Sequence, residues 1–194
     1  MTNPDYTALL FIIDRSGSMH TIKEDMEGGI NGVLEEQKNL PGDVTVDVAY
    51  FDDVLTYDDR FLSLESASIK IQPRGMTALH DAIVVSTRKF GDALSQLPED
   101  ERPGNVLVVI VTDGLENSSR EFNTADVKET LTLQQDTYNW QFVYLGANQD
   151  AIQTGENMGL RKGSSYNYVA TRGGTVDAAN IIGATITSAR TRIF

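Results

Sequence analysis

The chain has 194 residues, of which 40% are hydrophobic and 23% are charged, and it has no cysteine. This length predicts a single domain over residues 1–194 that buries a sizeable core without disulfides. The lack of cysteine excludes a disulfide framework, a thiolate zinc site and a cysteine nucleophile. The net charge of −12 argues against nucleic acid as a direct partner, because phosphate binding needs a basic face.

Membrane insertion and secretion are not expected from the sequence. The longest purely apolar runs, 8–13 and 106–111, are each six residues long and therefore too short to cross a bilayer. The first residues have neither the basic start nor the apolar stretch of a signal peptide. We therefore predict a cytoplasmic protein with no membrane partner.

In the first half of the chain, an apolar run at 8–13 predicts a central strand that is buried on both faces. Apolar residues then recur at helical spacing over 22–40. Residues 44–51 alternate between apolar and polar, which predicts a strand, and Asp52 and Asp53 are expected to turn the chain. The segment 54–61 is predicted to pair back as an antiparallel hairpin strand.

The second half alternates between helices and strands. Strands are predicted at 106–111, 140–145 and 166–169, and helices at 79–97, 124–136, 148–158 and 175–191. Such alternation is typical of an α/β fold: a doubly wound, mostly parallel open sheet with helices on both faces. In such a sheet, ligands bind beyond the carboxyl ends of the strands, where the strand order reverses.

Three loops at that edge carry oxygen-bearing side chains. Asp14, Ser16 and Ser18 follow the first predicted strand, Thr77 precedes the helix near Leu79, and Asp113 follows the strand 106–111. Two carboxylates and three hydroxyls are hard donors, which select Mg²⁺, or Mn²⁺, over zinc or copper. Neutral hydroxyls leave such an ion electrophilic, with a position free for water or for an outside carboxylate.

These motifs resemble those of the von Willebrand factor type A domain family, whose fold is Rossmann-like. The matching elements are Asp14-x-Ser16-x-Ser18 after an apolar strand, Thr77 in a Gly-x-Thr loop, and Asp113-Gly114 after a second apolar strand. The resemblance implies a metal-ion-dependent adhesion site. In that site Ser16, Ser18 and Thr77 would give hydroxyl oxygens, and the two aspartates would act directly or through coordinated water. It also implies that a partner's acidic side chain completes the coordination.

Each of these residues also has a simpler interpretation. Asp and Ser are favoured helix caps, so Asp14, Ser16 and Ser18 could cap the first helix without binding metal. His20 and His80 could contact a partner at the rim of the site, or could be exposed surface residues. Arg15 and Arg74 could steer an acidic partner, or could be solvated loop residues.

Two functions from different classes are consistent with the sequence. The first is a Mg²⁺-dependent protein-binding module that is not an enzyme, since no catalytic base or nucleophile accompanies the five donors. The alternative is a Mg²⁺-dependent phosphohydrolase or phosphoacceptor on a similar open sheet. That class generally needs a second acid near the first aspartate and a lysine that neutralises the phosphoryl group. The three loops contain no lysine, and position 16 is serine.

Overall fold

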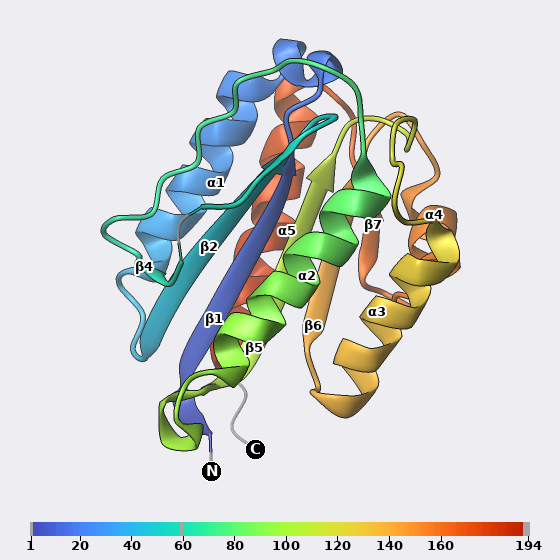
Figure 1. Ribbon diagram of the computed structural model, residues 1–194. Coiled ribbons are helices and arrows are strands. Elements are labelled where there is room, and N and C mark those ends of the chain that lie inside the picture. The colour runs from blue at the N-terminus through green and yellow to red at the C-terminus, as the bar shows by residue number, and fades with distance from the viewer. Residues whose placement is uncertain (1, 59, 192–194) are drawn as a thin grey trace.

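A computed structural model describes residues 2–58 and 60–191 (Figure 1). The predicted domain 1–194 also includes residues 1, 59 and 192–194, and the predicted strand 54–61 includes residue 59; these lie outside the described residues. Within these residues, seven strands form one sheet: β1 (Asn3–Asp14), β2 (Asp43–Phe51), β3 (Leu55–Thr56), β4 (Leu62–Ser63), β5 (Pro103–Thr112), β6 (Gln141–Gly146) and β7 (Ser165–Asn167). The strand order is β3-β2-β1-β5-β6-β7, and β4 pairs with β2.

Helices cover both faces of this sheet. They are α1 (Lys23–Gln37), α2 (Leu79–Ser95), α3 (Thr124–Thr137), α4 (Ala151–Asn157) and α5 (Arg172–Arg190), with 3₁₀ turns η1 (Gly17–Thr21) and η2 (Glu99–Glu101). Figure 1 shows α2 in front of the sheet and α5 behind it. The predicted fold class, a mostly parallel open sheet between two helical layers, is confirmed.

The central strand β1 is buried on both faces, as its continuous apolar run predicts. Leu9 and Phe11 belong to the core shared with α1 and α5. Leu10 and Ile12 belong to the core shared with α2 and α3. Because successive side chains of a strand point to opposite faces, only an uninterrupted apolar run can fill both cores.

The predicted hairpin strand differs from what the structure shows. In place of one strand over 54–61, two short antiparallel strands, β3 and β4, pair with β2. Asp47, buried in β2, accepts hydrogen bonds from the Tyr57 hydroxyl (2.6 Å) and from the Phe61 backbone N–H (2.6 Å). These bonds occupy the segment between β3 and β4 and take the place of backbone pairing there.

Helix α1 is shorter than predicted. It begins at Lys23, after η1, and ends at Gln37 rather than at residue 40. The Arg190 guanidinium of α5 donates to the carbonyl oxygens of Gln37, Leu40, Pro41 and Gly42. These carbonyls lie at the end of α1 or just after it, so a side chain of α5 satisfies acceptors that the helix end leaves open.

The two halves of the sheet are wound in opposite directions from β1 and β5. After β1 the chain enters α1 on one face, and after β5 it enters α3 on the other face. The register places Asp14 level with Phe51 on β2, and Ile13 level with Val111 on β5. The loops that follow β1 and β5 therefore diverge from a common level, and it is at such a reversal of strand order that open α/β sheets bind ligands.

No helix within residues 2–58 and 60–191 combines the length and the apolar character needed to span a membrane.

Packing of α1 on α5 predicts different effects for two neighbouring glycines. A Cβ on Gly28 would meet nothing within 4 Å, whereas a Cβ on Gly29 would lie 3.0 Å from the Cβ of Ala179. We expect Gly28→Ala to raise the free energy of unfolding by about 0.5–1 kcal/mol through helix propensity. Gly29→Ala should raise the free energy of unfolding less, or lower it, because α5 would have to move. Urea unfolding of both variants checks this, and equal gains would contradict the close packing.

Candidate metal site

Three loops meet at the carboxyl edge of the sheet, at the top of Figure 1. The Gly17 N–H donates to the Gly75 carbonyl (3.2 Å), and the Arg74 N–H donates to the Arg15 carbonyl (2.8 Å). Gly75 has a φ of 66°, a left-handed conformation that glycine adopts without steric cost. The loop before α2 is thus fixed by backbone hydrogen bonds to the loop after β1.

Asp14 is the most deeply buried of the five predicted ligands, with no exposed surface. One carboxylate oxygen accepts from the Ser16 backbone N–H (2.6 Å), and the other accepts from the Thr112 hydroxyl (2.6 Å). Thr112 ends β5, so this second bond joins the two strand ends across the crevice. Sequence reasoning did not identify Thr112, although it directly precedes Asp113.

The remaining predicted ligands lie around the same point. The Ser18 hydroxyl donates to an Asp113 carboxylate oxygen (2.5 Å) and lies 3.1 Å from the Ser16 hydroxyl oxygen. A Cβ placed on Gly114 would be 3.5 Å from the Thr77 hydroxyl oxygen and 3.7 Å from that of Ser18. The fold therefore brings together oxygen atoms from positions 14–18, 77 and 113, which are far apart in the chain.

The chemistry of this donor set fits a hard cation. Asp14 and Asp113 are 0% and 2% exposed, and neither forms an ion pair with any residue in the described part of the chain. A buried carboxylate without a cation is costly, because burial removes its hydration. Burial raises the pKa of Asp14 to about 6 and also raises the pKa of Asp113. Each carboxylate would be stabilised by a nearby positive ion.

The site contains only two acidic side chains. Accordingly, residues 2–58 and 60–191 contain no group of three or more His, Cys, Asp or Glu that could hold a metal. Three of the five predicted donors are hydroxyls, which such a cluster does not include. Magnesium keeps several waters and commonly takes only one or two carboxylates, so two acids are compatible with it.

The capping interpretation is not supported for the first loop. Ser16 is the N-cap residue of η1, but its side chain makes no capping hydrogen bond. The N-cap of α1 is Ile22, whose side chain has no hydrogen-bonding group. The Asp14 carboxylate does accept one local backbone N–H, from Ser16, but it precedes the helix by several residues. The hydroxyls of Ser16 and Ser18 are instead directed toward each other and toward Asp113.

Asp52 supports the site in a way that the sequence did not reveal. Its buried carboxylate accepts from the side chains of Arg15 and Arg74, each at 2.8 Å, and the two arginines keep the pKa of Asp52 below its usual value despite its burial. The Asp52 carbonyl also accepts from the Ala78 N–H (2.8 Å). Arg15 is thus a largely buried structural residue, whereas the Arg74 side chain is 61% exposed. Asp52 was predicted only as a turn residue.

The loop after β5 is tied to the start of α2. The Asn117 side-chain oxygen accepts from the Thr77 N–H (2.9 Å), and the Glu116 carboxylate accepts from the His80 N–H (2.9 Å). His80 is largely buried, with its ring 3.8 Å from Glu116, so it is not the surface residue of the simpler interpretation. His20 is exposed, as that interpretation expected.

Residues that follow β6 and β7 donate hydrogen bonds to the end of β5 and to the loop after it. The Asn148 amide donates to the Asp113 carbonyl (2.9 Å), and the Gln149 amide donates to the Gly114 carbonyl (2.9 Å). The buried Tyr168 hydroxyl donates to the Thr112 carbonyl (3.2 Å). These residues follow β6 and β7, and no motif in the sequence distinguished them.

Comparisons with known proteins give matches only at the level of structure. No family model and no curated protein matches the sequence. Proximal thread matrix protein 1 from the mussel byssus, in a structure with a zinc-occupied MIDAS motif, matches with a TM-score of 0.66 at 14% identity, over 93% of this chain and 46% of that chain. A von Willebrand factor type A protein from Catenulispora acidiphila matches with a TM-score of 0.63 at 16% identity, over 92% and 42%.

A third match has nearly the same length as this chain. The vWF domain of the type V pili tip protein Mfa5 from Porphyromonas gingivalis matches with a TM-score of 0.60 at 9% identity, over 97% of both chains. The fold is that of a von Willebrand factor type A domain. The chain spans less than half the length of the first two matched structures, so this type A fold corresponds to only part of them.

The burial of Asp14 predicts a specific pH dependence for the metal-free type A fold. Its folded pKa of about 6 exceeds the unfolded value of about 3.9. The folded state therefore binds this proton more tightly, and the resulting stabilisation is complete below about pH 4 and lost as the pH rises through about 6.

Asp14→Asn mimics the protonated carboxyl, and the Thr112 hydroxyl can reverse its role to accept from the amide. In chelator we expect the variant to be more stable than the wild type by on the order of 2 kcal/mol at about pH 7.5, with a much smaller difference at about pH 4. Urea unfolding at both pH values measures this. A stability difference between variant and wild type that does not change with pH would contradict the raised pKa of Asp14.

Proposed function

We propose that this chain is a Mg²⁺-dependent protein-binding module. Asp14, Ser16, Ser18, Thr77 and Asp113 would hold the ion, and the ion would accept an acidic side chain of a partner protein. The observation that carries the proposal is the pair of buried carboxylates, without a cationic neighbour in the described structure, beside hydroxyls at the sheet crevice. When bound, the ion would supply an electrophilic centre, while the chain's own loops orient its ligands.

The nature of the donors supports magnesium. All five are oxygen atoms, which suit Mg²⁺ and Mn²⁺ better than the nitrogen and sulfur donors that zinc favours. One solved structure with this fold has a zinc-occupied MIDAS motif. Zinc therefore belongs in the same measurements as magnesium and manganese.

The surroundings of the site favour a partner with an acidic residue next to apolar ones. Met76 and Leu115 each neighbour a ligand loop and are more than half exposed. Exposed apolar side chains beside a polar centre are common at protein interfaces. Arg74 adds an exposed positive group to a chain of net charge −12, and it would favour the approach of an acidic surface. Nucleic acid and membrane are not part of this proposal, and a cytoplasmic location stays a prediction.

The phosphohydrolase alternative requires groups that the ligand loops do not contain. No lysine occurs within 14–18, 75–77 or 113–114, although phosphoryl transfer generally uses one. A phosphate-ester assay with Mg²⁺ separates the two functions. Phosphate release that Asp14→Asn abolishes would favour the enzyme, and the absence of turnover would favour the binding module.

Metal binding predicts a large change in thermal stability. An ion present at roughly 100 times its Kd stabilises the folded state by about 2.7 kcal/mol, which raises the Tm of a domain of this size by about 5–10 °C. We expect Mg²⁺ to give this shift in the wild type and chelator to reverse it. Differential scanning calorimetry measures the shift, and isothermal titration gives the stoichiometry.

Variants of the site test whether the shift comes from the predicted ligands. Asp14→Ala and Ser18→Ala should lose the Mg²⁺ shift, whereas Ser188→Ala, an exposed serine on α5, should retain it. A shift that survives Asp14→Ala would place the ion elsewhere. The absence of binding for Mg²⁺, Mn²⁺ and Zn²⁺ in the wild type would overturn the proposed function.

A further inference from the structure

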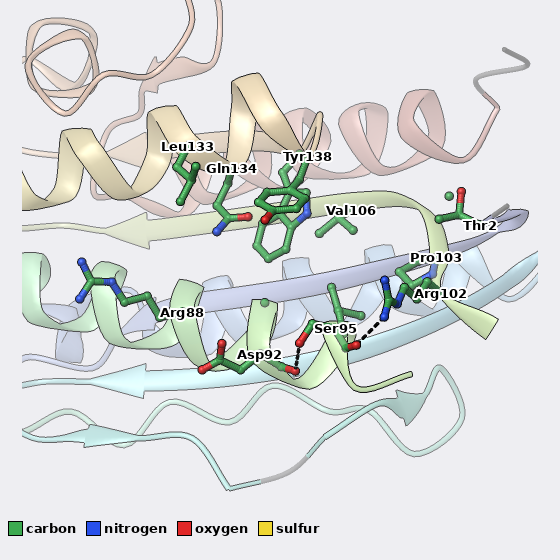
Figure 2. Close-up of a pocket in the computed structure, with 14 residues that line it drawn as sticks. Thr2, Arg88, Asp92, Ser95, Arg102, Pro103, Val106, Leu133, Gln134 and Tyr138 are labelled. Atoms are coloured by element: carbon green, nitrogen blue, oxygen red, sulfur yellow. Dashed lines mark hydrogen bonds between the residues drawn. The ribbon is translucent and has the colours of Figure 1, made fainter. Parts of the chain in front are cut away.

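A second pocket lies between α2 and α3, at the opposite edge of the sheet from the metal site (Figure 2). Its volume is about 640 Å³, within the range of pockets that enclose small molecules. Pro103 and Val106, at the start of β5, line it, whereas the metal site follows the end of the same strand. The roughly 20 Å length of β5 beyond Val106 separates the two.

The floor of this pocket is a rigid aromatic surface. Trp140 is only 6% exposed and packs edge-on against Phe90, with ring centroids 5.6 Å apart. On the α2 side, position 91 is a glycine, and a Cβ there would lie 3.5 Å from the indole. The missing side chain of Gly91 lets the indole pack directly against α2.

Two polar groups on buried residues of the pocket make no hydrogen bond with the described residues, although neither is fully shielded from solvent. The Gln134 side chain, on a residue that is 9% exposed, makes no hydrogen bond through its amide, and Figure 2 shows it projecting from α3 toward α2. The Trp140 indole N–H likewise has no protein acceptor. A donor–acceptor pair and a further donor that line a pocket and are not paired within the described protein are available to a ligand.

The two arginines that line the pocket already interact with other groups of the protein. The Arg88 guanidinium lies over the Phe122 ring, 5.1 Å from its centroid, and Arg102 donates to the carbonyls of Leu97 and Ser95. Asp92 is an exposed carboxylate at the mouth. The pocket therefore offers no free cationic cluster for a phosphate, and it favours an uncharged ligand.

We propose that this pocket binds a planar, uncharged heteroaromatic compound whose edge carries a hydrogen-bond donor beside an acceptor. The Tyr138 ring, which is 61% exposed, and the edge of the indole line the pocket and suit a flat ring. A glutamine amide pairs with a neighbouring amino group and ring nitrogen, as on the edge of adenine, and the indole N–H takes a further acceptor. The site is independent of the metal site and of the proposed protein-binding function.

Trp140 lines the pocket and is the single tryptophan of the chain, so its fluorescence reports directly on ligand binding there. We use adenosine as the probe and follow the tryptophan fluorescence of the full chain, with Mg²⁺ and with chelator. The expected result is saturable quenching with a Kd below about 1 mM, unchanged by the metal. Adenosine methylated twice on its exocyclic amine lacks the donor and should bind roughly tenfold more weakly.

Variants identify the groups that bind. Gln134→Leu removes the amide and should raise the Kd for adenosine roughly tenfold, as measured by equilibrium dialysis. The control Gln153→Leu, at an exposed position of α4, should bind adenosine like the wild type. Gly91→Leu fills the pocket and should abolish binding, and its Tm shows that it folds. No saturable binding by the wild type, or undiminished binding by Gln134→Leu or by the methylated adenosine, overturns the proposal. Neither result bears on the Mg²⁺ measurements.

Discussion

The burial of two carboxylates at one point of the sheet edge is the constraint on which the rest of this edge depends. Asp14 ends β1 and Asp113 directly follows β5, and because these strands lie side by side, their parallel register brings the two residues together. Each loses its hydration, and each accepts hydrogen bonds from neutral groups alone. Neutral donors reduce the cost of burial without cancelling the charge, and a divalent cation would cancel it.

The surrounding structure holds this unfavourable arrangement in place. Asp52 ties two arginine side chains to the end of β2, and its carbonyl anchors the start of α2. Asn117 fixes the loop that carries Thr77, and Asn148 fixes the loop that carries Asp113. These bonds involve four different strand ends, and they hold the oxygen atoms of the site in place. Such preorganisation lowers the cost of ordering the site on binding.

The two edges of the sheet offer different chemistry. At the carboxyl edge, loops place hard oxygen atoms and exposed apolar side chains around a crevice, which suits an ion and a protein surface. At the amino edge, a pocket between α2 and α3 is lined by Gly91 and Trp140. There an apolar floor and the unpaired amide of Gln134 suit a small flat molecule. Both features follow from a sheet that is covered by helices on both faces.

The sequence by itself determined the α/β class, the order of the main elements and the five oxygen donors. The apolar run of β1 and the helical spacing of α2 are local patterns, and the aspartates directly follow strands. Only the tertiary structure decided how those donors are held. The bond between Thr112 and Asp14, the role of Asp52 and the contact of Gly91 with Trp140 each join segments that are distant in the chain. Periodicity describes which face a residue occupies, but not which distant residue it meets there.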